Sequence, residues 1–397
     1  MSKKISLGAA IGLIFICVAL AVVITITASG SIYNSILQNL PEKVQTYSML
    51  EEVGNIVKSN YYGNIDQSSL DIATAEGYIE GLGDGYSRYM SASEWAKYDA
   101  TIQGRMTGIG IEYKKSGSRI KITKVYSGSP AEVSGLSKGD NIVAFDGEAV
   151  TNENYKDMVA KLEGDKLSTV NLTYRHSGTE KTVSVAMGYE AQSVDVHAIG
   201  QLGYIRISDF YSTTKEQVQK AVDKFVSQEA TAGLIIDLRD NSSTNFEAAI
   251  SVTDIFVPTV EGSDSIARVT DAKGNILSSY SSDASAVNLP IVVIVNNGTL
   301  GGAELLAADL RDFGKAQIIG TQTSGMAVMQ KVFKLTDGGA LLLSVGEITP
   351  YKSESYNNKG IKPDFEVTGK QTDEIADDPL FIYASSLIEK DSAEEEQ

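Results

Sequence analysis

The sequence contains little cysteine and histidine, and this limits the chemistry that its side chains can perform. Cys17 is the one cysteine among 397 residues and lies in an apolar N-terminal stretch, so no disulfide can form within the chain. The two histidines, His176 and His197, have no cysteine, second histidine or paired carboxylates near them in sequence. We therefore expect no zinc site and no other metal or cofactor. A Ser-His-Asp triad stays open by count alone, but no nucleophile-elbow pattern supports one.

Positive charge is also scarce. The chain has 34 lysines and arginines against 51 aspartates and glutamates, which gives a net charge of -17 at pH 7. A chain this acidic repels the phosphate backbone, so a nucleic-acid partner is excluded. Some of the acidity lies in residues 394–396, a run typical of a solvated tail. The length suits two or three domains, and the 42% hydrophobic content is sufficient for packed cores.

One long apolar run lies at the N-terminus. It extends from Ile5 to Ala28 without a charge and follows Lys3 and Lys4. A helix of this length spans a hydrocarbon core of about 30 Å. We favour an uncleaved, single-pass anchor in the cell membrane over residues 1–34. The two lysines predict a cytoplasmic N-terminus and an extracytoplasmic body. A cleaved signal peptide is the alternative.

The rest of the chain changes its pattern twice, which predicts a mixed α/β protein. Residues 35–103 have helical spacing, and residues 104–189 have the pattern of strands and turns. Strands and helices alternate over residues 190–370, which predicts a largely parallel sheet covered on both faces. Residues 371–397 are expected to form a C-terminal helix and an acidic tail. The sequence pattern predicts strands or helices with clear bounds at residues 119–125, 142–145, 155–162, 169–174, 182–187, 203–207, 215–226, 233–238, 291–295 and 303–310.

Part of the strand-rich region resembles the core of a PDZ domain. The stretch Ser129–Val143 carries this resemblance, and Gly108-Ile109-Gly110-Ile111 lies upstream, where a PDZ domain has its carboxylate-binding loop. In such a domain an extended peptide adds a strand to the sheet edge, and N–H groups of the loop bind the terminal carboxylate. Glycines let the backbone approach the ligand closely. The resemblance implies that peptide or protein C-termini are the partners.

The segments on either side resemble the C-terminal processing peptidases, which are the tail-specific proteases of serine peptidase family S41. Five motifs recur in the family's order: Gly85–Tyr89, Leu234–Asn241, Ile291–Asn296 followed by Ala303–Ala307, Ile318–Gly320, and Lys359–Asp364. The resemblance implies a PDZ domain inserted before an α/β peptidase-like core. It also implies that the helical segment before the PDZ domain mediates dimerisation, so we expect a homodimer or a partnership with an active relative.

Active members of that family cleave peptides with a Ser-Lys pair. A lysine accepts the serine proton only if burial lowers its pKa toward neutrality, and a glutamine orients this lysine. The alignment implied by the resemblance places the serine position at Gly301 and the lysine position at Met326, and it retains Gln330. A glycine cannot attack a carbonyl, and a thioether cannot accept the proton. We therefore predict a pseudopeptidase that binds peptides without cleaving them.

A third departure concerns the oxyanion hole, whose N–H donors stabilise the negative charge of the intermediate. After Asn241 the family has a Pro-Gly-Gly-type segment, whereas this chain has Ser242, Ser243 and Thr244. Side chains at these positions restrict the backbone. We expect this loop to form no working oxyanion hole.

Two alternatives remain open. An active endopeptidase could use a displaced nucleophile, since Thr299, Ser324, Ser242 and Ser243 lie in the right loops. The nearest lysines argue against this, because we expect Lys331 to point away from Gln330 in a strand and Lys315 to be solvent-exposed in a turn. A structural relic with a closed PDZ groove is the other alternative.

Two acidic side chains in the same region are expected to have structural and not catalytic roles. Glu304 lies in the first turn of the expected helix 303–310, where an acidic side chain interacts favourably with the helix dipole. Asp237 ends an apolar strand close to Arg239, which is its expected partner.

Overall fold

The computed structural model describes residues 40–395, apart from residues 163–167, 229, 261–265, 283–285 and 373. The chain divides into two units, residues 1–74 and residues 75–397. The first contains helix α2 (Leu40–Asn60) and the first half of helix α3 (Gln67–Glu80). No described helix is both long and apolar enough to cross a membrane. The predicted anchor at residues 1–34 lies outside the described residues.

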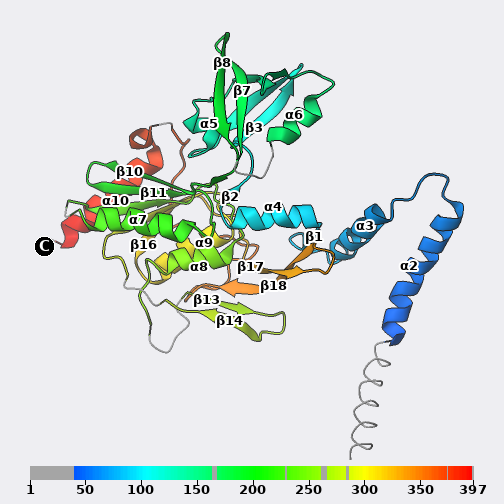
Figure 1. Ribbon diagram of the computed structural model, residues 1–397. Coiled ribbons are helices and arrows are strands. Elements are labelled where there is room, and N and C mark those ends of the chain that lie inside the picture. Colours follow the sequence, from blue (N-terminus) through cyan, green and yellow to red (C-terminus); the bar gives the residue numbers. More distant parts are fainter. Residues whose placement is uncertain are drawn as a thin grey trace, which may run out of the picture. The chain divides into compact units, whose positions relative to one another are not determined.

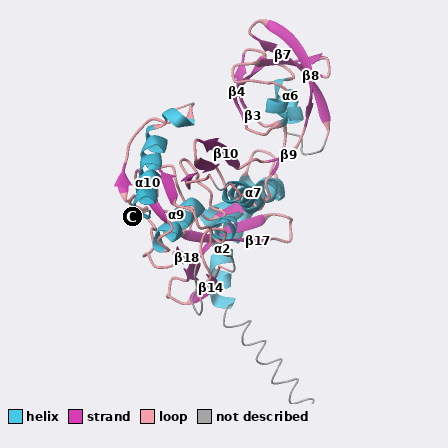
Figure 2. Ribbon diagram, turned by 90° about the vertical axis from the view of Figure 1, so that its left-hand side faces the viewer, coloured by secondary structure: helices cyan, strands magenta, loops and turns pink. Residues whose placement is uncertain are grey.

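The PDZ-like part of the second unit is a small antiparallel sheet with two short helices (Figure 1). Its strand order is β3-β4-β5-β7-β8, so β3 forms one edge. The elements are β3 (Ile111–Ser116), β4 (Arg119–Val125), α5 (Pro130–Val133), β5 (Asn141–Phe145), β6 (Glu148–Ala149), α6 (Tyr155–Leu162), β7 (Thr169–His176) and β8 (Thr179–Ala186). Apolar side chains from strands β4, β5, β7 and β8 and from α6 form its core. Figure 2 shows α6 among the strands of this sheet.

A second sheet of six strands forms the centre of the peptidase-like part. Its order is β10-β11-β12-β15-β16-β19, and every neighbouring pair is parallel except β10 with β11. The strands are β10 (Val194–Ile199), β11 (Leu202–Ile207), β12 (Gly233–Asp237), β15 (Ile291–Val295), β16 (Ala316–Gly320) and β19 (Phe365–Glu366). The prediction of a largely parallel sheet is confirmed.

Helices cover both faces of this sheet. One face packs against α7 (Thr214–Val226), α8 (Phe246–Thr253) and α9 (Gly302–Asp312) in the largest apolar core. The other face packs against α10 (Pro379–Glu395) in a separate apolar cluster. The strands are buried on both faces, which explains why β12 and β15 are apolar without alternation.

The five-stranded antiparallel sheet is the part of the fold that the sequence pattern did not predict. It has the order β1-β18-β13-β14, with β17 also paired to β18. The strands are β1 (Arg88–Met90), β13 (Ala267–Thr270), β14 (Ile276–Tyr280), β17 (Val328–Lys334) and β18 (Ala340–Thr349). A helix α4 (Ala92–Ile102) and a two-stranded ribbon of β2 (Arg105–Met106) and β9 (Tyr189–Glu190) lead into and out of the PDZ-like sheet. A short 3-10 helix, Ile375–Asp377, precedes α10.

Candidate functional site

Gly301 lies in the turn that joins strand β15 to helix α9. Its backbone has φ 67° and ψ -118°, a conformation that a residue with a side chain adopts only at a cost. A Cβ atom at this position would overlap the carbonyl oxygen of Ser243 and would lie 3.3 Å from the Ser243 carbonyl carbon. The predicted nucleophile position therefore lacks a side chain and has no room for one.

The same carbonyl accepts a hydrogen bond from the N–H group of the residue that follows Gly301. Gly302 donates its N–H to the Ser243 oxygen at 2.9 Å, and Ser243 donates its own N–H to Asn241 Oδ1 at 3.1 Å. An oxyanion hole needs free donors aimed at the reacting oxygen. Here the loop Ser242–Thr244 presents a carbonyl oxygen next to Gly301, which is an acceptor and not a donor. The N–H groups of Gly302 and Ser243 are both already hydrogen-bonded.

Glu304 connects the nucleophile position to the lysine position. Its carboxylate accepts the N–H of Gly301 (3.0 Å), Gly325 (2.8 Å) and Met326 (2.9 Å), and it also accepts the hydroxyl of Thr323. The main-chain N–H groups of residues 301 and 326 therefore meet at one carboxylate. The Glu304 carboxylate hydrogen-bonds the main-chain N–H groups of both residues and not their side chains. Met326 is buried, with 1% of its surface exposed.

Burial governs the electrostatics around this carboxylate. Burial raises the pKa of Glu304, and the hydrogen bonds from Thr323, Met326, Gly301 and Gly325 oppose that rise. The N–H of Gly301 belongs to the start of α9, so the predicted role of Glu304 at the helix start is confirmed. Its bonds to residues 323–326 add a second structural role.

The predicted carboxylate-binding loop keeps the features that PDZ chemistry needs. Gly108 and Gly110 have φ 73° and 79°, and a Cβ at Gly110 would overlap the side chain of Ser129. The carbonyls of Gly108, Ile109 and Gly110 accept N–H groups from Gly188, Ala131 and Tyr126. The N–H groups of residues 108–110 donate to no acceptor among the described residues. They are available to an anion.

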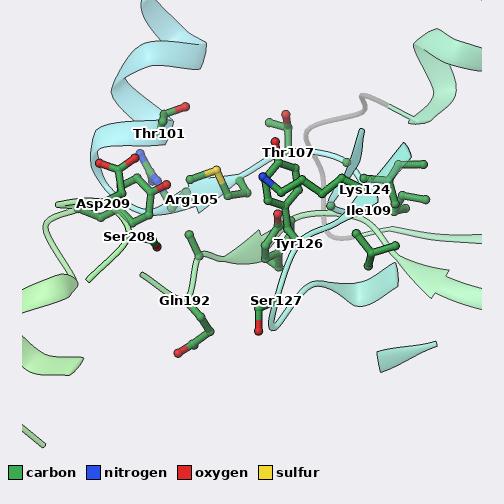
Figure 3. A pocket seen from close by; sticks show the side chains of 18 of the residues that line it. Thr101, Arg105, Thr107, Ile109, Lys124, Tyr126, Ser127, Gln192, Ser208 and Asp209 are labelled. Atoms are coloured by element: carbon green, nitrogen blue, oxygen red, sulfur yellow. The ribbon is translucent and has the colours of Figure 1, made fainter. Parts of the chain in front are cut away.

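A cavity of about 930 Å³ opens at this loop. Ile109, Ile111, Tyr113 and Leu162 give its wall an apolar section next to the loop. Figure 3 shows Arg105, Ser208 and Asp209 on the opposite side from Ile109 and Lys124, with Tyr126 between them. Burial, with the hydrogen bond to Glu112, raises the pKa of Tyr126 to about 12. The cavity can hold an extended peptide end.

Comparison with known proteins identifies both parts of the second unit. Residues 201–367 match the family model described as "Peptidase family S41", and residues 107–187 match the model described as "PDZ domain". The chain therefore has a region similar to peptidase family S41, which follows a region similar to a PDZ domain.

Curated relatives agree with this assignment. The chain is similar to the carboxy-terminal processing protease CtpA of Bacillus subtilis (strain 168), with 28% identity over 357 residues, 88% of this chain and 75% of that protein. It is 27% identical to a probable CtpA-like serine protease of Staphylococcus aureus (strain N315), over 80% of this chain and 64% of the relative. The chain thus spans just under two thirds of that staphylococcal protein. The resemblance to C-terminal processing peptidases is confirmed.

Among solved structures, the chain is similar to the photosystem II D1 C-terminal processing protease, with a TM-score of 0.49 and 26% identity over 77% of this chain and 84% of that chain.

Two of the hydroxyls that could act as displaced nucleophiles in this S41 domain are bonded to carbonyls. Thr299 donates to Leu238 O at 2.9 Å, and Ser324 donates to Asn297 O at 2.6 Å. Neither has a lysine partner among the described residues.

The nearby lysines of the S41 domain are engaged elsewhere. Lys331 is exposed, and its ammonium lies 5.7 Å from the centre of the Phe333 ring, so it points away as predicted. Lys315 is half-buried, with Nζ 3.5 Å from Val287 O. The prediction that Lys315 is solvent-exposed was wrong, because the turn after α9 packs against the segment that precedes β15.

Gln330 has a new partner in this chain. Its Nε2 donates to the carbonyl of Tyr86 at 2.9 Å, so it fastens strand β17 to the turn before β1. This bond gives the Gln330 side chain a structural role, because it holds that turn in place.

Asp237 is a structural partner, as predicted. Its carboxylate accepts the Tyr204 hydroxyl at 2.6 Å and Arg239 Nε at 3.0 Å. Arg239 also donates to Asp378 at 2.9 Å, at the start of α10. This buried network joins the end of β12 to α10 and has no contact with residues 301 or 326 among the described hydrogen bonds.

Sequence reasoning missed two groups around residues 301 and 326. The Ser243 carbonyl lies where a side chain at residue 301 would be, and the Tyr356 hydroxyl donates to Gly301 O at 3.1 Å. Burial holds the pKa of Tyr356 well above its usual range. No sequence signal marks these groups, since one is a main-chain atom and the other comes from a distant segment.

Proposed function

We propose that this chain is an S41-family pseudopeptidase that binds the C-termini of peptides or proteins and does not cleave them. The observation that carries the proposal is the Ser243 carbonyl, which takes the space of a nucleophile side chain at Gly301 and also accepts the Gly302 N–H. Met326 adds to it, because a buried thioether cannot serve as the general base.

The binding part of the proposal rests on the PDZ domain. Residues 108–110 offer unbonded N–H groups beside an apolar wall, and strand β3 offers a free edge to an added strand. Binding by strand addition requires none of the residues that peptide cleavage requires. The two functions can therefore separate in one chain.

Two assays on the same preparation test the proposal. An unstructured reporter peptide with a fluorophore–quencher pair measures cleavage, with the Bacillus subtilis relative as the positive control. Fluorescence anisotropy measures binding of labelled peptides that end in a free carboxylate or in an amide. We expect no cleavage, and we expect the free carboxylate to bind at least tenfold more tightly than the amide.

The same assays separate the alternatives. Sustained cleavage that is lost in Thr299→Val or Ser324→Ala would establish an active endopeptidase with a displaced nucleophile. Absence of both cleavage and carboxylate-dependent binding would favour the structural relic.

The proposal also places the body outside the cytoplasm, held by the apolar run at residues 5–28. This rests on the length of the run and on Lys3 and Lys4. Membrane fractionation with protease added to intact cells tests it, and release of a shortened chain would indicate a cleaved signal instead. Chemical cross-linking of the same cells would report a homodimer or a complex with an active relative.

A further inference from the structure

Strand β3 presents alternate side chains to the peptide groove. Residues i, i+2 and i+4 of a strand share one face. Ile111 and Tyr113 pack against the PDZ core, so Lys115 lies on the same face, toward α6. Its ammonium lies 4.7 Å from the centre of the Tyr155 ring, at the first residue of α6. Lys115 therefore lies farther along β3 from the carboxylate loop than Tyr113, which is the last residue of β3 in the lining of the cavity.

On the opposite face of β3, the carboxylate of Glu112 has both a hydrogen-bond partner and a charged partner. Glu112 accepts the Tyr126 hydroxyl at 2.9 Å and lies 3.6 Å from Lys124. Among the described residues, no carboxylate lies within 4.0 Å of the Lys115 ammonium. Lys115 does influence one acidic group, Glu153. The hydrogen bond from Thr151 is the main cause that lowers the pKa of Glu153, and the charge of Lys115 lowers it further. Glu153 is fully exposed and leaves Lys115 free to meet a ligand.

The position of the carboxylate loop fixes the direction of a bound peptide. The loop immediately precedes β3, so a peptide whose terminal carboxylate binds there runs antiparallel to β3. Its terminal residue lies opposite Ile111, its second residue back opposite Tyr113 and its fourth opposite Lys115. All three side chains face α6, which extends roughly 10 Å from Leu162 to Tyr155, and same-face side chains of a strand repeat every roughly 6.6 Å.

We propose that Lys115, seated on Tyr155, makes this groove select C-terminal peptides with an aspartate or glutamate at the second or fourth residue before the terminal one. The inference rests on the proposed carboxylate binding and adds the chemistry of the preferred peptide. An acidic side chain at either place reaches the ammonium, and the Tyr155 hydroxyl offers a donor beside it. At the first or third place back, the side chain points away from α6.

Isomeric peptides test the position directly. Four labelled hexapeptides of identical composition end in valine and carry their single aspartate at the first, second, third or fourth place before it. Fluorescence anisotropy with the full chain measures each dissociation constant. We expect the second- and fourth-place isomers to bind about threefold to fivefold more tightly than the other two, which is the size of an exposed ion pair. The difference should shrink as salt rises from 0.05 to about 0.5 M.

Two exposed, adjacent lysines give a matched pair of variants. Lys115→Glu should abolish the preference and favour isomers with lysine in place of aspartate. Lys114→Glu changes the net charge equally but lies on the other face of β3, so it should leave the ranking of the isomers unchanged. Equal effects of the two variants would overturn the proposal, because they would show a general charge effect.

The test distinguishes failure of this inference from failure of the proposed function. If all four free-carboxylate isomers bind equally and their amides do not, carboxylate binding stands and the role of Lys115 is refuted. If free acids and amides bind alike, or none binds, the proposed function itself fails.

Discussion

At the scale of single residues, Gly301 combines a left-handed backbone with a filled side-chain space. Gly301→Ser should therefore destabilise the fold more than a positive φ alone explains. Gly314 is the matched control, since its φ of 66° is nearly the same and a Cβ there meets no atom within 4 Å. We expect Gly314→Ser to lower the free energy of unfolding by about 1–2 kcal/mol. Gly301→Ser should lower it by about 2 kcal/mol more.

Urea unfolding of the two variants measures the difference. Equal losses would show that the Ser243 carbonyl moves aside without cost. The centre would then be open to a side chain.

Asp309 gives a pH-dependent prediction at the same scale. Burial raises its pKa well above 3.8, its Oδ1 accepts the Tyr351 N–H, and Oδ2 has no hydrogen-bond partner among the described residues. A raised pKa means that the folded state binds the proton more tightly, so the stability from this group is full below about pH 3.8 and is lost as pH rises toward the raised value. Asp309→Asn cannot ionise and escapes that loss.

The expected result is a difference that grows with pH. Wild type and Asp309→Asn should be about equally stable near pH 4. The variant should gain relative to wild type by up to about 1.4 kcal/mol per pH unit above that. Thermal unfolding across pH 4–8 measures it, and a constant difference between the two proteins would refute the raised pKa.

At the scale of elements, the start of helix α9 and the loop 323–326 depend on one carboxylate. Glu304→Gln replaces an oxygen that accepts N–H groups with an amide nitrogen that cannot accept them. At least one buried N–H then loses its partner, at a cost of about 1–3 kcal/mol each. The control is Glu247→Gln in the first turn of α8, where the side chain is exposed and the change should cost under about 1 kcal/mol. Hydrogen exchange at residues 323–326 should also accelerate in Glu304→Gln alone.

The elements that the sequence predicted well are local ones. Strand 119–125, helix 155–162 and strand 291–295 have the predicted bounds, because side-chain period and turn residues decide such segments within a short window. The five-stranded antiparallel sheet escaped prediction because its pairs join distant segments, such as Arg88 with Leu342. Each strand there is short or irregular, and only the fold shows that they pair.

At the scale of the whole molecule, the sequence predicted which residues stand at the two catalytic positions but not what surrounds them. The structure joins the main chains of residues 301 and 326 through Glu304. The orientation of the Ser243 carbonyl could not be read from side chains, because it is a property of the backbone of Ser242–Thr244. We predict that the oxyanion hole is lost in this loop, and there the structure shows the Ser243 carbonyl bonded to the Gly302 N–H.

That carbonyl decides the outcome of restoring the catalytic residues. Gly301→Ser with Met326→Lys supplies a hydroxyl and an amine, yet the serine Cβ would overlap the Ser243 oxygen and the Gly302 N–H would remain bonded to it. We expect this double variant to cleave no reporter peptide. Replacing residues 242–244 with Pro-Gly-Gly as well frees the backbone to turn its carbonyl away, and we expect cleavage only in that five-residue variant. The loop replacement alone is the control and should be inactive. Cleavage by the double variant would show that the loop is no barrier, and that only two side chains separate this chain from an active peptidase.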